Sequence, residues 1–175
     1  IFLLKAPSQG IDAEDEPQAG NDFAVNSLAA FNLSHVKYNE TEAKNRVAAC
    51  ISRRYRITSD AARKITQLAE QVAAKHALDP NLILAIIANE SKFHPLLVSP
   101  VGALGLMQIM PATGESVASA LQVPHSSLRL FEVEHNVKLG SAYYRELLDR
   151  FDGNRVFALA AYNAGPHRVD RWRQR

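Results

Sequence analysis

The stretch that most constrains the fold is ILAIIANESKFHP, residues 83–95. Asp79 and Pro80 stand directly before it, and an Asp N-cap followed by Pro at the first helical position is typical of a helix start. The helix predicted over 80–90 carries apolar residues on nearly every side. A helix that is apolar all round has to be buried. We therefore expect residues 80–90 to lie at the centre of a core, with Glu90 at the end of the helix.

Helical patterns fill most of the chain beyond this stretch. Residues 57–78 and 133–151 place apolar side chains at spacings of three and four, as amphipathic helices do. In the second of these, the apolar stripe consists of Val137, Tyr144, Leu147, Leu148 and Phe151. Shorter helices are predicted over 41–55, 155–165 and from Pro111. Strict apolar–polar alternation is hard to find, so we predict an all-α domain of about seven helices over residues 41–175.

The beginning of the chain has a different composition. Residues 5–22 hold Pro, Gly and Gln together with five acidic residues against one Lys. Such a segment has too few apolar side chains to offset the entropy lost on ordering. We therefore predict that residues 1–40 form a flexible or partly helical N-terminal segment ahead of the helical domain.

Composition excludes several classes of site and partner. Cys50 is the only cysteine, so an intrachain disulfide is impossible and a cysteine-based metal site is not expected. The six histidines are scattered and no HExxH pair exists. No run of four Lys/Arg residues marks a nucleic-acid surface, and no apolar run approaches the roughly 18 residues of a membrane span. We expect no metal, no cofactor, no nucleic-acid partner and no transmembrane segment in this chain.

The chemistry of interest centres on Glu90. A carboxyl group beside apolar walls is disfavoured in its charged form, so its pKa rises and it can act as a general acid near neutral pH. The next carboxylate downstream is Glu115, and the residues between them are rich in Gly, Ser and Gln. A charged residue on a helix is more often a solvated surface group. The apolar run before Glu90 argues against that reading and favours an isolated acid beside a sugar-binding surface.

Three longer strings give this reading a family. NESKFHPLLVSPVGALGLMQIMPATG, NVKLGSAYYRELLDRF and ALAAYNAGPHRV follow one another in the chain. They contain ES at 90–91, GLMQ at 105–108 and AYN at 161–163. In this order and spacing they resemble the catalytic domain of the soluble lytic transglycosylases, glycoside hydrolase family 23. The resemblance implies a goose-type lysozyme-like helical fold with a glycan-binding cleft.

The resemblance also implies a role for Glu90. It matches the single catalytic acid/base of the family, which protonates the glycosidic oxygen between N-acetylmuramic acid (MurNAc) and N-acetylglucosamine (GlcNAc). As a carboxylate it then removes the proton of the C6 hydroxyl of the same MurNAc. That hydroxyl closes on C1 and leaves a 1,6-anhydroMurNAc end.

Five further residues match substrate-binding positions of the family: Ser99, Gln108, Met110, Tyr162 and Asn163. Ser99 corresponds to a hydroxyl near the cleaved bond, and Gln108 and Met110 to groove residues. Tyr162 is expected to direct its hydroxyl at Glu90, and Asn163 to bond substrate or hold the neighbouring loop. Taken without the family, Met110 is more often core filler, Gln108 a surface residue and Tyr162 a packed core aromatic.

The sequence therefore predicts a bacterial peptidoglycan lytic transglycosylase, a lyase of the periplasm or cell envelope that acts on glycan strands. Its small size and its family suggest an accessory to a secretion system, pilus, flagellum or phage particle. One alternative is a goose-type lysozyme that hydrolyses the same bond, although such an enzyme usually uses an Asp to activate water, and residues 91–114 contain no acid. The other alternative is an inactive peptidoglycan-binding module.

Overall fold

The computed structural model of the chain describes the backbone of residues 33–174 and the side chains of residues 42–174. Residues 41–175 form one compact unit, which is the part described below. The N-terminal segment predicted for residues 1–40 lies for the most part outside the described residues, and that division of the chain stays a prediction.

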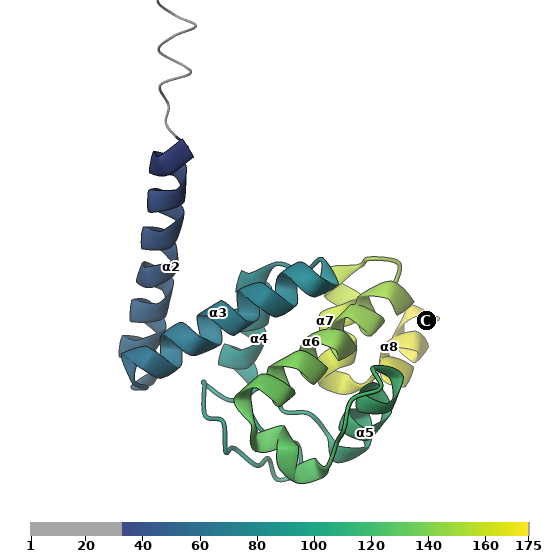
Figure 1. The fold of residues 1–175 in the computed structure, drawn as a ribbon. Coiled ribbons are helices and arrows are strands. Elements are labelled where there is room, and N and C mark those ends of the chain that lie inside the picture. Colours follow the sequence, from purple (N-terminus) through teal and green to yellow (C-terminus); the bar gives the residue numbers. More distant parts are fainter. Residues whose placement is uncertain (1–32, 175) are drawn as a thin grey trace, which may run out of the picture. The chain divides into compact units, whose positions relative to one another are not determined.

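Helices make up nearly all of the regular structure that the described residues contain (Figure 1). The elements are α2 (Leu33–Tyr55), α3 (Ser59–His76), α4 (Pro80–Glu90), α5 (Pro111–Ala120), the 3₁₀ helix η1 (Ser127–Phe131), α6 (Val133–Arg150), α7 (Arg155–Ala164) and α8 (Pro166–Arg173). Between residues 33 and 174 there are seven α-helices and no regular strand, so the all-α prediction is confirmed. The helix predicted over 41–55 begins earlier, at Leu33. Extending an existing helix costs little, so it can run past its apolar stripe.

Helix α4 has the capped start and the burial that its sequence predicts. The side chain of Asp79 accepts a hydrogen bond from the backbone N–H of Asn81, and Pro80 occupies the first turn. Ile83 and Ile87 are wholly buried, and α4 packs against α3. The helix ends where Lys92 and Phe93 take positive φ angles of 51° and 65°. This reversal leaves Glu90 as the last helical residue.

Helix α6 contacts α3, α5, α7 and η1, and it runs beside α3 and α7 in Figure 1. All five residues of its predicted apolar stripe are buried in the core. Three polar residues, His135, Asn136 and Ser141, are buried on the same helix. A buried polar group is costly unless it is hydrogen-bonded, so we expect these side chains of α6 to have hydrogen-bond partners elsewhere in the fold.

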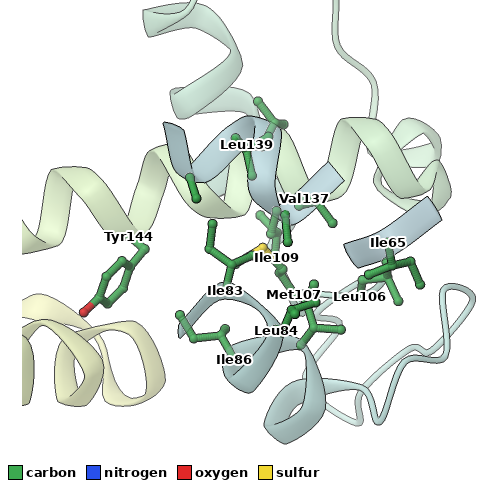
Figure 2. Close-up of a cluster of buried hydrophobic side chains, with 14 of the residues drawn as sticks. Ile65, Ile83, Leu84, Ile86, Leu106, Met107, Ile109, Val137, Leu139 and Tyr144 are labelled. Carbon is green, nitrogen blue, oxygen red and sulfur yellow. The ribbon is translucent and has the colours of Figure 1, made fainter. Parts of the chain in front are cut away.

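The Gly-rich segment that joins α4 to α5 is held closely against the helices. Isolated bridges pair Val98 with Leu104 and Leu104 with Ile109. Leu106, Met107 and Ile109 are buried, and Figure 2 shows Met107 and Ile109 among side chains of α4 and α6. We call residues 97–110 the motif loop, because it carries GLMQ. The buried side chains of Leu106, Met107 and Ile109 thus anchor the motif loop in the core, although other residues of the loop are exposed.

Candidate active site

A cavity of about 310 Å³ lies between α4 and α7. Its lining comes from these two helices alone: Leu82, Ala85, Ile86, Asn89, Glu90, Leu159, Tyr162 and Asn163. A largely apolar cavity with a few polar groups is typical of small-ligand sites. The structure thus brings together three of the six predicted site residues, Glu90, Tyr162 and Asn163.

Glu90 is the only carboxyl group among the residues that line this cavity. Glu90 is half-buried, and this burial raises its pKa above the ordinary value. A hydrogen bond from the Asn89 amide, 3.3 Å from Oε1, lowers the pKa by a smaller amount. None of the ion pairs within residues 42–174 includes Glu90. The C-terminal end of a helix is also the negative end of its dipole, which disfavours an anion there. The geometry therefore favours the protonated acid.

Tyr162 reaches the same cavity from α7, but its hydroxyl is committed elsewhere. Within the described residues, the hydroxyl donates its proton to the backbone carbonyl of Met107, at 2.8 Å, and not to Glu90. The donor bond of this hydroxyl is therefore made to Met107, and the expected orientation of the hydroxyl toward Glu90 stays a prediction. Both residues line the same cavity, and burial first and then the Glu90 charge raise the pKa of Tyr162.

The motif loop is anchored by Asn136, a residue to which the sequence reading gives no role. Its Oδ1 accepts a hydrogen bond from the N–H of Met107 at 2.8 Å. Its Nδ2 donates to the carbonyls of Leu104 and Leu130, at 2.9 and 2.7 Å. Asn136 is 1% exposed, so all three bonds are shielded from water. The sequence feature that could have revealed Asn136 is its position next to Val137, on the predicted buried face of an amphipathic helix.

Two glycines allow the motif loop to lie this close to α6. A Cβ atom at Gly105 would stand 2.2 Å from the carbonyl oxygen of Leu130 and 2.3 Å from Nδ2 of Asn136, and its φ of +77° disfavours other residues as well. A Cβ atom at Gly140 would stand 2.5 Å from the sulfur of Met107. Gly105, the glycine of the GLMQ motif, therefore allows close packing against η1 and α6. Gly140 makes room for the side chain of Met107, the methionine of the same motif.

The other three predicted site residues belong to the motif loop and do not line the cavity. The Ser99 Oγ accepts from the N–H of Ala103 at 2.9 Å, inside its own turn. The amide nitrogen of Gln108 donates to the carbonyls of Leu97 and Gly105, at 3.1 and 2.8 Å. Met110 stands before α5 with its side chain 41% exposed.

These contacts bear on what the three residues offer to a glycan. The N–H₂ group of Gln108 is used to brace the loop, so its carbonyl oxygen is the part of the amide that these bonds leave to a ligand. The exposed Met110 side chain is available for apolar contact. Their binding of glycan stays a prediction.

The histidines show one pairing that their spacing in the sequence hides. Nδ1 of His125 lies 2.9 Å from Nε2 of His135, and the rings stack with centroids 5.3 Å apart. Burial is the first cause that lowers the pKa of His135, followed by nearby cations. Within residues 42–174, no three His, Cys, Asp or Glu side chains gather as metal ligands would. That the site works without a metal stays a prediction.

Comparison with known proteins identifies the family. The model of the transglycosylase SLT domain matches residues 67–175, which is more than half of the chain. The chain belongs to the transglycosylase SLT domain family. The matched span contains α4, the motif loop and α7, so the SLT domain includes both walls of the cavity.

Named relatives of this SLT domain are similar over about half of the chain. The soluble lytic murein transglycosylase of Salmonella typhimurium is 44% identical over 51% of this chain and 14% of its own length. The transglycosylase of Enterobacteria phage PRD1 is 36% identical over 56% of this chain and 34% of its own length. The chain thus spans a minor part of the relatives that it matches.

Solved structures support the same fold for the SLT domain. An inactive mutant of the lytic transglycosylase Slt from Pseudomonas aeruginosa is 39% identical, with a TM-score of 0.59 over 61% of this chain and 17% of its own. A complex of the 70-kDa soluble lytic transglycosylase with bulgecin A is 32% identical, with a TM-score of 0.61 over 70% of this chain and 19% of its own. The predicted lysozyme-like helical fold is confirmed. In the described residues no helix has the length and hydropathy needed to cross a membrane.

Proposed function

We propose that this chain is a peptidoglycan lytic transglycosylase that cleaves the β-1,4 bond between MurNAc and GlcNAc. The observation that carries the proposal is a single carboxyl group, Glu90, whose pKa is raised by burial in a cavity of an SLT domain. The relatives named as murein transglycosylases support the substrate class. The P. aeruginosa relative, whose inactive form carries a Glu-to-Gln exchange, supports a glutamate as the essential group.

The proposed reaction uses Glu90 twice. The protonated carboxyl group gives its proton to the glycosidic oxygen, and the bond between that oxygen and C1 of MurNAc breaks. The C6 oxygen of the same MurNAc then bonds to C1, and its proton passes to the Glu90 carboxylate. Proton and charge return to their starting state, no water is consumed, and the product is a 1,6-anhydro end. A positioned internal hydroxyl competes well with water because its effective concentration is high.

The lone carboxyl group shapes the rest of this mechanism. Two carboxylates are the rule among glycosidases, and enzymes with one carboxylate use substrate assistance. We infer that the acetamido group of MurNAc stabilises C1 while the leaving group departs. The exposed Asn163 side chain lines the cavity and can bond such a substituent. Ser99, Gln108 and Met110 are proposed to contact the glycan strand beyond the cavity.

The nature of the product tests the proposal against the hydrolase alternative. Isolated sacculi are digested with the protein, and the muropeptides are analysed by mass spectrometry. We expect ends that are lighter by one water than hydrolysed ends. A digest that contains only reducing MurNAc would show a lysozyme instead, and an undigested sacculus that still binds the protein would show a binding module. Glu115→Gln, on α5 and outside the cavity lining, serves as the matched control for Glu90→Gln.

The proposed site of action follows from the substrate. Peptidoglycan strands lie in the bacterial periplasm or cell envelope, and we propose that the chain acts there. The phage relative supports the proposal that such a domain can serve a larger machine that crosses the wall, such as a secretion system, pilus, flagellum or phage particle.

A further inference from the structure

The motif loop meets the cavity-lining Tyr162 at Met107, which contacts from α6 and α7 hold in place. Its N–H donates to Asn136, its carbonyl accepts from Tyr162, and its buried side chain packs against Gly140. Asn136 and Gly140 are four residues apart on α6, so they lie on one face of the helix. Helix α6 thus fixes Met107 from one side while α7 reaches its carbonyl from the other.

The Met107 carbonyl decides how the Tyr162 hydroxyl is oriented. A carbonyl only accepts hydrogen bonds, whereas a phenol has one proton to donate and lone pairs to accept with. With its proton on the Met107 oxygen at 2.8 Å, Tyr162 has only lone pairs left for the cavity. A protonated carboxyl group can donate to those lone pairs. A carboxylate cannot, because two acceptors repel each other.

We propose that Asn136 is a positioning residue for the Glu90 site. By holding the Met107 backbone, it keeps the Tyr162 proton on the Met107 carbonyl, so that the phenol presents an acceptor to the cavity. Asn136 acts through Met107 and Tyr162 and touches neither Glu90 nor the cavity. This inference rests on the proposed function only for its catalytic meaning, since the hydrogen bonds themselves need no substrate.

The surroundings of Glu90 leave few competing influences. Its pKa responds to burial and to Asn89, and no charged side chain is among the causes. The titratable group that shares the cavity with Glu90 is Tyr162, on α7, and the ring centroid of Tyr143, on α6, lies 5.5 Å from that of Tyr162. Burial raises the pKa of both phenols, so both stay neutral while Glu90 titrates.

The test measures the Glu90 titration directly, by NMR of the protein with ¹³C-labelled glutamate side chains. In Asn136→Ala the Met107 backbone is released, and the Tyr162 proton is free to turn to the Glu90 carboxylate. Donation to the charged form stabilises it, so we expect the Glu90 pKa to fall by about one unit. Val117→Ala, which removes buried aliphatic atoms from α5, is the control for a loss of stability alone, and it should leave the Glu90 pKa unchanged.

A double-substitution cycle shows whether Asn136 acts through the phenol. In a Tyr162→Phe background, Asn136→Ala should no longer move the Glu90 pKa, because the proton it redirects is gone. Asn136→Ser, which leaves a smaller void, is used in the same cycle if the alanine variant does not fold. The proposal is overturned if a folded Asn136 variant keeps the parent's Glu90 pKa, or if its shift is equally large in the Tyr162→Phe background. Since the titration needs no substrate, failure of the parent to cleave peptidoglycan would refute the proposed function and leave this test intact.

Discussion

Two glutamates at opposite ends of helices show how the surroundings of one type of side chain can shift its pKa in opposite directions. Glu90 is the last residue of α4, half-buried, without an ion pair, and its pKa is raised by burial. Glu132 is the N-cap residue of α6 and its carboxylate accepts three hydrogen bonds from Arg129 at 3.1 to 3.2 Å. Those bonds lower the pKa of Glu132. A helix start and a guanidinium favour the anion, whereas a helix end and apolar walls favour the acid.

The largest expected difference between the two glutamates is in catalysis. Glu90→Gln keeps the shape of the side chain and removes the transferable proton, so we expect cleavage of peptidoglycan to fall by about a thousandfold or more. Glu132→Gln should stay within about twofold of the parent, as surface changes away from a site do. Initial rates of sacculus solubilisation measure both. If Glu90→Gln cleared sacculi as fast as the parent, the proposed mechanism would be refuted.

The pH dependence of cleavage tests the raised pKa of Glu90. In the proposed mechanism Glu90 has to be protonated to begin the reaction, so we expect activity to be present below its raised pKa and to fall as pH climbs through that value. A rate that is flat from mildly acidic to strongly alkaline pH would contradict this.

A cation placed in the cavity should make Glu90 behave like Glu132. Leu159 lines the cavity and is 39% exposed, so the longer side chain of Leu159→Lys can be accommodated. We expect the lysine to lower the Glu90 pKa and to move the alkaline limb of the pH–rate profile down by about one unit. Leu128→Lys, on η1 at a position that is 78% exposed, is the matched control and should leave the profile in place.

The smallest expected effect is on stability, and its sign differs between the two glutamates. The Glu90 pKa is raised above its ordinary 4.5, so the stabilisation from its protonated form is present below 4.5 and is lost as pH rises through the folded-state value. Glu90→Gln should therefore raise the midpoint of thermal unfolding relative to the parent at neutral pH, and the gain should shrink in acid.

Glu132 should show the opposite behaviour. Its lowered pKa gives stability that is present above the ordinary value and is lost as pH falls through the folded-state value. Glu132→Gln should therefore lower the unfolding midpoint at neutral pH. Calorimetric scans of both variants at several pH values measure the two signs, and equal signs at neutral pH would break the contrast.

Much of the frame around the site could be predicted from local pattern. The Asp79 cap, the apolar run of α4 and the stripe on α6 each depend on residues within a few turns of one another, and the structure agrees with all of them. The Gln108 amide was harder to foresee. Its two donor bonds within the motif loop depend on the positive φ of Gln108, 48°, and on the turn at Gly105. A motif names the residue and leaves open which of its atoms remain available.

The residues alone were enough to predict a buried apolar helix with one isolated acid at its end, because capping and periodicity act between near neighbours. The bond from Tyr162 to Met107, 55 residues away, and the bond from Met107 to Asn136, across 29 residues, could be known only from the folded chain. Hydrogen bonds of this kind depend on distances of a few tenths of an ångström. Those distances are set when α4, α6, α7 and the motif loop pack together.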